Sequence, residues 1–154
     1  MADAEQINFF LVDMFGRMNK IEERAMTEGL GSAVSITEIH IIEKIGAQEP
    51  TRMSEVARAC GVTLATLTVA CDKLEAKGLV HRSRDRSDRR VVNVTLTDKG
   101  RAAYEYHRAF HERMLSSILE TLSPDEAAVL ADSIEKLQDF FRQEEAGTGG
   151  AFHG

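Results

Sequence analysis

Hydrophobic residues follow helical spacing at both ends of this chain. In residues 5–28 they recur in steps of four and three, which predicts one long helix with a seam for packing against another helix; the seam comprises Ile7, Leu11, Met14, Met18, Ile21 and Ala25. A second long helix is predicted from a cap at Thr97 to about Thr121. A last helix begins with the start signal Ser123-Pro124-Asp125-Glu126 and again places apolar residues in steps of three and four, as far as Phe141.

The middle of the chain predicts shorter elements. Ser35 to Glu38 is a capping box that begins a helix through about Lys44, and a loop follows over residues 46–51. Ser54 is expected to cap a short helix that ends at Cys60, before a turn at Gly61. The next helix starts after Thr63, ends at Gly78 and buries an apolar stripe at i, i+3, i+4 and i+7 spacing, formed by Leu67, Ala70, Cys71 and Leu74.

The opposite face of the helix after Thr63 carries small or polar side chains, and a β-hairpin with an arginine-rich tip follows it. A small-sided helix face can enter a groove of DNA, and threonine offers a hydroxyl and a methyl group to base edges. Val91, Val92 and Val94 supply the return strand of the hairpin. The predicted DNA contacts are Thr63, Ala65, Thr66, Thr68, Val69, Asp72 and Lys73 on the helix, and Arg82, Arg84, Arg86, Arg89 and Arg90 on the wing. A merely solvated hairpin is the alternative, which five arginines in residues 82–90 argue against.

These elements predict a mainly α fold with a small β-wing. We expect a winged helix-turn-helix at residues 35–97, a discontinuous helical dimerisation domain at 5–34 and 98–145, and a disordered Gly-rich tail at 146–154. The winged segment does not need long helices at both ends, so a homodimer with interleaved ends is the economical explanation. Two wings would then address two half-sites one helical turn apart.

Charge is distributed unevenly along the chain, whose net charge is −6. Residues 63–101 hold nine Lys/Arg and five Asp/Glu, or +4, which leaves −10 on the remainder. Local charge decides phosphate binding, so the acidic total does not exclude DNA. The sequence shows neither a signal peptide nor a membrane span, and Cys60 and Cys71 are expected to be buried thiols. We expect a cytoplasmic bacterial protein that is associated with the nucleoid.

The motifs of the central region resemble those of the MarR family of bacterial winged helix-turn-helix repressors. The matching stretches are Leu74 to Val80, Asp88-Arg89-Arg90 at the wing tip, and Leu96-Thr97-Asp98-Lys99-Gly100 after it. The resemblance implies that residues 65–73 enter the major groove and that Arg89 or Arg90 reaches the minor groove. It also implies that Asp88 braces the wing by an ion pair to Arg90. Arginine is favoured in narrow minor grooves on physical grounds too.

Within the family, the sequence is most similar to a subgroup of streptococcal fatty-acid-biosynthesis repressors. That likeness runs through residues 36–40, 62–68, 88–92 and 107–111, and it implies a long-chain acyl group on acyl carrier protein as corepressor. Met14, Phe15, Met18 and His40 are the candidate effector pocket, with simple core packing as the alternative. The acidic carrier protein would require a basic patch such as Arg17, Lys20, Arg24 or Arg113.

A histidine pattern supports a different effector. His107 and His111 share a helix face at i, i+4, a spacing that can hold a metal ion. A zinc-sensing branch of the same family resembles this arrangement, and it implies a site made by His40, His107, His111 and either Glu22 or Glu23. Zinc is therefore the alternative effector, although no cofactor is required for DNA binding. The simpler interpretation is that these histidines hydrogen-bond to their neighbours.

Other functions fit the sequence less well. The chain lacks the G-x-S-x-G, P-loop and G-x-G-x-x-G motifs, and His107-x-x-x-His111 lacks the glutamate of a metalloprotease helix, so we do not expect an enzyme. A winged helix that binds proteins instead of DNA is a more distant alternative, because such a wing needs no dense positive charge. Oxidant sensing is disfavoured because buried thiols are poor sensors.

Overall fold

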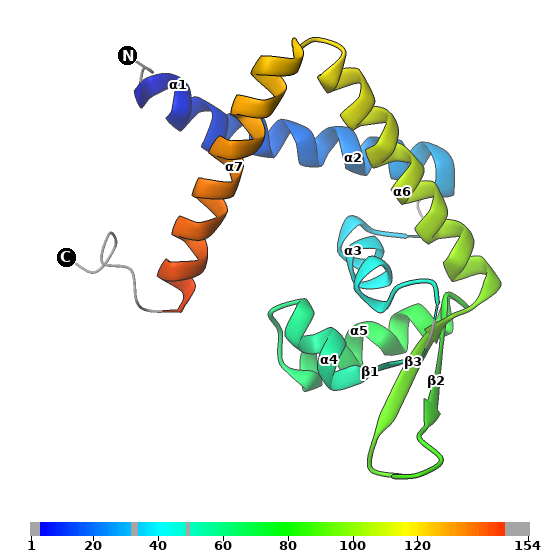
Figure 1. Cartoon of the computed structure of the whole chain (residues 1–154). Coiled ribbons are helices and arrows are strands. Elements are labelled where there is room, and N and C mark those ends of the chain that lie inside the picture. Colours follow the sequence, from blue (N-terminus) through cyan, green and yellow to red (C-terminus); the bar gives the residue numbers. More distant parts are fainter. Residues whose placement is uncertain (1–3, 32–33, 49, 147–154) are drawn as a thin grey trace. The chain divides into compact units, whose positions relative to one another are not determined.

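The computed structural model describes residues 4–31, 34–48 and 50–146. Its N-terminal part is one continuous helical segment, formed by α1 (Ala4–Phe9), the π-helical turn η1 (Phe10–Met14) and α2 (Phe15–Leu30) (Figure 1). The predicted long helix is therefore confirmed, with a π-turn inside it that the spacing did not indicate. The segment ends at Gly31, whose φ of +72° lies in the left-handed region that favours glycine.

The central elements begin with α3 (Ile36–Ile45), which carries the predicted capping box. The Ser35 side chain accepts a hydrogen bond from the Glu38 backbone N–H, and the Ser35 N–H donates to Glu38 at 2.8 Å. The short strand β1 (Thr51–Arg52) leads directly into α4 (Met53–Ala59), and α5 (Leu64–Ala76) follows with Thr63 as its N-cap. The prediction that Ser54 caps α4 is wrong. The extended pairing of β1 ends at Arg52, so the helix begins at Met53 and has no side-chain cap.

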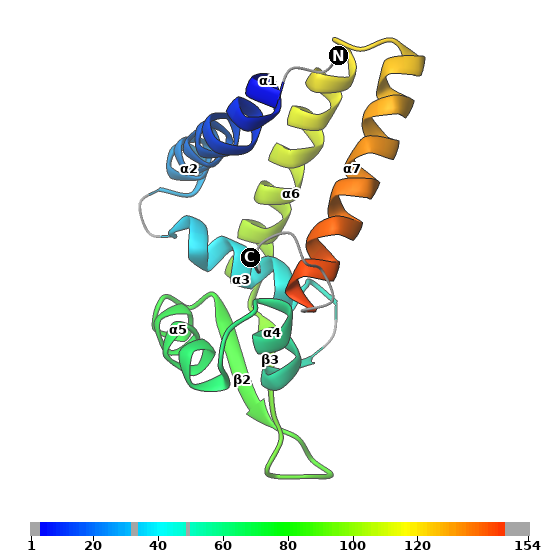
Figure 2. The ribbon, with the colours of Figure 1, turned by 90° about the vertical axis from the view of Figure 1, so that its left-hand side faces the viewer.

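The sheet is antiparallel, with the strand order β1-β3-β2. Strands β2 (Val80–Arg84) and β3 (Val92–Leu96) form the predicted hairpin, in which Val80 pairs with Leu96 and Arg84 with Val92 (Figure 2). On its other edge β3 pairs with β1, Thr51 opposite Val94. The mainly α fold with a small β-wing is thereby confirmed.

The core of the central elements joins the apolar stripe of α5 to α3 and β3. Leu67, Cys71 and Leu74 of the predicted stripe are fully buried, together with Ile39 and Ile42 of α3. Ala70, the fourth residue of the stripe, is only partly buried. The start of α6 (Asp98–Leu119) is fixed against the end of α5, because Thr97 Oγ1 donates to the Gly78 carbonyl at 2.6 Å. A Cβ atom at Gly100 would lie 1.9 Å from the Leu79 carbonyl oxygen, so only glycine fits this close approach.

By its contacts the chain divides into two compact units, residues 1–111 and 112–154. The second unit contains the end of α6 and α7 (Pro124–Glu145), whose predicted capping box is present: the Ser123 N–H donates to Glu126 at 2.8 Å. The domain boundaries predicted from the sequence stay a prediction, and the predicted disordered tail falls almost wholly on residues 147–154, outside the described residues. None of the helices described has the length and apolar character of a bilayer-spanning segment.

Candidate nucleic-acid interface and histidine cluster

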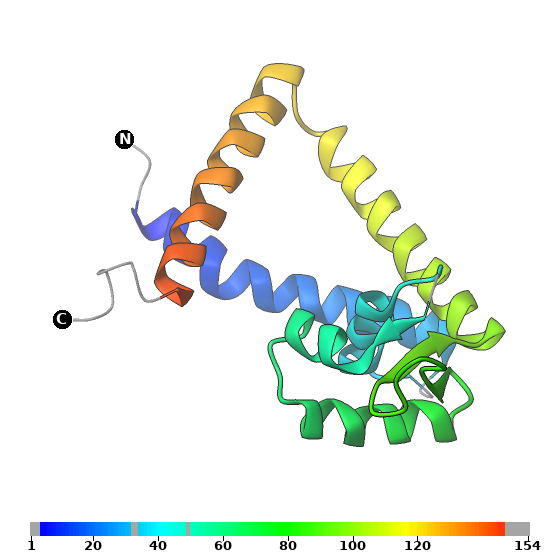
Figure 3. The same cartoon turned by 60° about the horizontal axis from the view of Figure 1, so that its bottom comes forward.

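Helix α5 lies on the side of the first unit away from α2 and presents one face outward (Figure 3). Ala65, Val69, Asp72 and Lys73 are exposed on that face. Two of the predicted threonines already use their hydroxyl groups in hydrogen bonds within the helix. The Thr63 hydroxyl caps the helix, and the Thr68 hydroxyl donates to the Leu64 carbonyl at 2.8 Å. The outward face therefore presents a small side chain, an apolar side chain and two charges, and Thr66 turns toward a cavity described below.

The wing tip is organised around Asp85, which the sequence analysis did not single out. Its carboxylate accepts hydrogen bonds from the Ser87 hydroxyl (2.5 Å), the backbone N–H groups of Ser87 (2.8 Å) and Asp88 (3.1 Å), and the Asn93 amide (3.3 Å). These bonds, that of the Ser87 hydroxyl above all, hold the pKa of Asp85 well below its ordinary value. A carboxylate two residues before a serine in a turn is the local signal that could have identified it.

The ion pair between Asp88 and Arg90 is present as the family resemblance implied. The guanidinium donates to both carboxylate oxygens, at 3.0 and 3.1 Å. The Arg90 side chain nevertheless stays 91% exposed, so its cationic surface remains available to a ligand. Hydrogen bonds from the Arg90 side chain and backbone also lower the pKa of Asp88, so this carboxylate stays ionised and keeps the wing arginine oriented.

The remaining wing arginines fall into two classes. Within the described part of the chain, Arg84, Arg86 and Arg89 are exposed and have no carboxylate partner. Arg82 differs, because its side chain is 21% exposed and is bound to Asp72 and Glu75 of α5. The structure therefore brings two predicted DNA contacts, Arg82 and Asp72, to each other.

A hollow of about 280 Å³ lies between α4, α5 and the wing, and it includes an arginine that sequence reasoning missed. Arg52 of β1 is exposed there, together with Ser54, Thr68, Arg82 and Arg90. Arg52 lies opposite Asn93 of β3, so strand β1 adds a positive charge beside the wing. The two-residue strand gave no sequence signal that could place this side chain.

Three histidines from two helices converge on one glutamate of a third. The Oε1 atom of Glu22 in α2 lies 3.2 Å from His40 Nε2, 2.5 Å from His107 Nε2 and 3.1 Å from His111 Nε2. His107 and His111 bring their Nε2 atoms to 3.0 Å from each other. Glu22 and His107 are buried, whereas His40 reaches the cluster from α3 with half its side chain exposed.

The donor set of this cluster suits zinc. A tetrahedral Zn²⁺ ion binds nitrogen and oxygen at about 2.0–2.1 Å, so its ligand atoms stand about 3.3 Å apart. The distance from Glu22 Oε1 to His111 Nε2 is within a few tenths of an ångström of that value, and the one to His107 Nε2 is shorter. Among the described residues, Glu22, His107 and His111 bring ligand atoms within 4.8 Å of one another, whereas His40 approaches Glu22 but stands outside this group of three. Burial alone raises the pKa of Glu22, but hydrogen bonds with His107, His111 and His40 outweigh it and lower the pKa, so the carboxylate is ionised as a metal ligand requires.

The structure distinguishes between the two glutamates that the sequence left open. Glu22 and Met26 are the buried residues of α2 and share one face of the helix. Glu23 is exposed and makes no contact with the histidines among the interactions of the described residues. Glu43 Oε2 lies 3.6 Å from His107 Nδ1, on the side of the ring away from Glu22.

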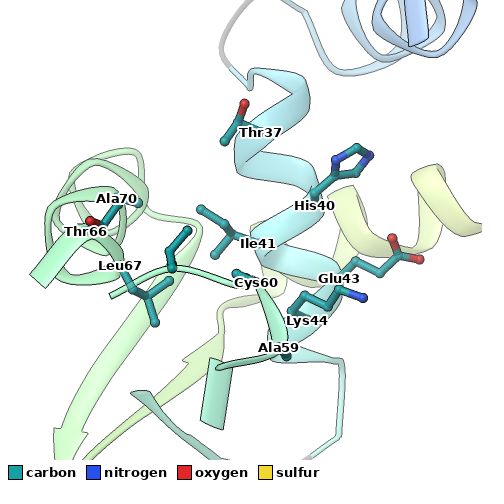
Figure 4. A pocket seen from close by; sticks show the side chains of 11 residues that line it. Thr37, His40, Ile41, Glu43, Lys44, Ala59, Cys60, Thr66, Leu67 and Ala70 are labelled. Atoms are coloured by element: carbon teal, nitrogen blue, oxygen red, sulfur yellow. The ribbon is translucent and has the colours of Figure 1, made fainter. Parts of the chain in front are cut away.

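A cavity of about 560 Å³ lies between α3, α4 and α5, next to His40. Residues of α3, among them Ile41 and Lys44, form one side of it, and Leu67 and Ala70 of α5 form another (Figure 4). The structure does not place the other predicted effector residues there: Met14, Phe15 and Met18 are 38–60% exposed on the N-terminal helical segment. Their seam faces outward, so the predicted four-residue pocket is not assembled within one chain and stays a prediction for a dimer.

Cys71 is buried as expected, but the same expectation is wrong for Cys60, which is only partly buried because it lies at the end of α4 and lines the cavity beside α3. Burial raises the pKa of Cys71 to about 11 and also raises the pKa of Cys60. Neither thiol is therefore activated as a thiolate near neutral pH.

Comparison with known proteins agrees with this geometry. A model of the MarR family matches residues 34–92. The transcriptional regulator ZitR of Lactococcus lactis is 30% identical over 109 residues, which cover 69% of this chain and 74% of that protein. The HTH-type transcriptional repressor YetL of Bacillus subtilis is 29% identical over 146 residues, 90% of this chain and 86% of that protein. The crystal structure of Streptococcus pneumoniae FabT in complex with DNA superimposes with a TM-score of 0.87 at 35% identity, covering 92% of this chain and 99% of that one.

Proposed function

This chain belongs to the MarR family of DNA-binding transcriptional regulators. We therefore propose that it acts as a homodimeric repressor and that zinc regulates its affinity for a pseudo-palindromic operator. Helix α5 enters the major groove with Ala65, Val69 and Lys73, and the wing follows the adjacent minor groove with Arg89 and Arg90. Similarity to FabT, which was crystallised with DNA, and to the repressor YetL supports this assignment.

Dimerisation is proposed because, in the part of the chain that the structure describes, the apolar seams of the N-terminal helical segment and of α7 are exposed. Ile7, Leu11, Met14, Met18 and Ile21 are 38–58% exposed, and the seam of α7 is equally open. Contiguous exposed apolar surface of this kind marks an interaction site. A second copy of the chain would bury it and would pair two wings for two half-sites.

The convergence of His40, His107 and His111 on Glu22 Oε1 is the observation that carries the proposed metal response. His40 belongs to α3, which packs against the helix-turn-helix, whereas Glu22 lies on α2 and the other two histidines on α6. Zinc held by Glu22, His107 and His111, with the half-exposed His40 turned in as the fourth ligand, would fix α3 against α2 and α6. An ion that binds one arrangement of these helices better than another shifts the population of DNA-competent molecules.

Metal stoichiometry tests the zinc site. Purified protein is loaded with zinc, desalted and analysed by mass spectrometry of the metal. The wild type should retain about one ion per chain, and the double variant His107→Ala/His111→Ala should retain none. Glu23→Gln is the matched control and should bind like the wild type, because Glu23 lies outside the cluster. No uptake by the wild type, or equal uptake by the double variant, rejects the metal response.

A fatty-acyl effector is the second candidate, and the cavity beside α5 favours it. About 560 Å³ with apolar walls from Ile41, Leu67 and Ala70 falls within the usual range for small-molecule sites. The resemblance to the fatty-acid-biosynthesis repressor subgroup supports an acyl group delivered by acyl carrier protein. Gel shifts with a selected operator decide it: acylated carrier protein should change the affinity, and the unacylated carrier should not. Equal affinity in both removes this effector.

A further inference from the structure

We propose that Arg82 is a positioning residue that fixes the recognition helix α5 to the wing, and is not a phosphate contact. Arg82 is the third residue of β2, and its partners Asp72 and Glu75 lie on the last two turns of α5. The contact therefore joins the two elements that must enter neighbouring grooves of the same duplex.

The Arg82 guanidinium is bound by two carboxylates, those of Asp72 and Glu75. Arg82 Nε and Nη2 donate to Glu75 Oε2 at 3.2 and 2.8 Å, and Nη2 also donates to Asp72 Oδ1 at 2.6 Å. The backbone N–H of Arg82 donates to the other Glu75 oxygen at 3.0 Å. Glu75 thus binds the strand through its main chain and its side chain together. A planar guanidinium held at several points permits little rotation, and so defines an angle as well as a distance.

The charge of the cluster argues against a phosphate contact. One arginine faces two carboxylates, so the group carries a net negative charge beside a surface that meets DNA. The guanidinium is largely covered, unlike the exposed side chains of Arg84, Arg86 and Arg89. Hydrogen bonds with Glu75 raise the pKa of Arg82, and those from Arg82 lower the pKa of Glu75, so both groups stay charged. Such a cluster attracts phosphates poorly but holds the wing in register.

Removal of Glu75 distinguishes a phosphate contact from a positioning role, because the two roles predict opposite changes in affinity for the selected duplex. A duplex selected from a random library by the wild-type protein is the specific probe, and an unrelated duplex of equal length is the non-specific one. If Arg82 contacted phosphate, Glu75→Ala would free it and remove a repelling charge, so both duplexes would bind more tightly. If Arg82 positions the wing, Glu75→Ala should weaken binding to the selected duplex roughly tenfold, a loss comparable to that of one base contact. Unchanged or tighter specific binding overturns the proposal.

The salt dependence of Arg82→Ala supplies an independent readout. Loss of one phosphate contact lowers the slope of log affinity against log salt by about 0.9. We expect Arg82→Ala to bind the selected duplex more weakly with the wild-type slope, whereas Arg84→Ala should lower the slope. A slope for Arg82→Ala that falls as in Arg84→Ala overturns the proposal. Thermal unfolding is followed for each variant, and Glu75→Gln replaces Glu75→Ala if the latter is not fully folded at the assay temperature.

Discussion

Glu22 and His107 are 85 residues apart in the sequence, yet Glu22 Oε1 lies 2.5 Å from His107 Nε2 in the buried interior of the first unit. The contact places α2 against α6, and His40 extends it to α3 at 3.2 Å. The three helices therefore meet at polar atoms as well as at the apolar core that contains Met26, Ile39 and Ala103. The proposed metal ion would act on their relative arrangement at this polar contact.

His40 should couple zinc to DNA more than it contributes to zinc affinity. Of the four candidate ligands, His40 alone belongs to α3, and it is the most exposed of the three histidines. We expect His40→Ala to bind zinc more weakly while operator affinity no longer changes with zinc. By linkage, operator DNA should alter the zinc affinity of the wild type by the same factor as zinc alters operator affinity. Isothermal titration with zinc, in the presence and in the absence of the selected duplex, measures how far DNA alters the zinc affinity. Operator binding with and without zinc measures the reciprocal change. A zinc effect on the operator that persists at full size in His40→Ala would show that coupling takes another route.

The partly buried ion pair between Glu38 and Lys77 should stabilise the helix-turn-helix in a pH-dependent way. Lys77 Nζ lies 2.7 Å from both carboxylate oxygens and joins the start of α3 to the end of α5. Lys77→Met should lower the free energy of unfolding by about 1–2 kcal/mol at neutral pH, since a charged hydrogen bond is lost from a shielded carboxylate. Arg24→Met, which breaks the exposed pair with Glu28, is the control and should have no measurable effect.

The sign of the pH effect follows from Glu38. Burial on its own raises the pKa of Glu38, but hydrogen bonds from Lys77 and Ser35 lower it below its usual 4.5. A carboxylate with a lowered folded-state pKa contributes stability above the unfolded-state value and loses it as the pH falls through the folded-state value. The difference between wild type and Lys77→Met in urea unfolding should therefore shrink as the pH falls below about 4.5. A difference that stays constant to lower pH would mean that the pair contributes by packing alone.

The sequence predicted the elements whose signals are local. Capping boxes at Ser35 and Ser123 and the stripe from Leu67 to Leu74 depend on neighbours within one or two turns, and the structure contains them. The sequence did not predict strand β1 because two residues carry no alternating pattern, and its pairing with β3 depends on residues more than forty positions away. The mistaken cap at Ser54 follows directly from that omission.

The sites were harder to predict than the fold, because partners distant in sequence decide what each charged residue does. Adjacent residues on a helix point in different directions, so periodicity alone could not separate Glu22 from Glu23, and only packing of α2 on α6 does so. In the same way Arg82 belongs to an arginine-rich hairpin by sequence, but Glu75 on the preceding helix engages it. The charge density of the sequence therefore predicted the wing, but it could not predict which arginines bind carboxylates of the same chain and which stay exposed.

The exposed wing arginines should account for much of the salt dependence of DNA binding. Arg86 and Arg89 have no carboxylate partner among the described residues and lie at the tip of the hairpin. The double variant Arg86→Ala/Arg89→Ala should lower the slope of log affinity against log salt by about 2 if both meet phosphates. Lys136→Ala on α7, where the lysine pairs with Asp132, is the matched loss of positive charge and should leave the slope unchanged. Equal slopes in all three proteins would exclude the wing tip from the phosphate contacts.

The apolar seam of α7 should be part of the dimer interface. Its residues are 41–45% exposed in the single chain: Leu130, Ile134, Leu137 and Phe141. If a second chain covers this seam, Leu137→Glu introduces a charge into an apolar interface, and burial of an unpaired charge there is strongly unfavourable. Sedimentation at micromolar concentration should then show a monomer. Operator binding should weaken because the two DNA-binding units are no longer linked in one molecule. Glu135→Lys changes a charge on an exposed position of the same helix and should leave the dimer intact. A Leu137→Glu variant that remains dimeric would leave the pairing of the two wings to the N-terminal helical segment alone. A wild type that sediments as a monomer would reject the homodimer itself.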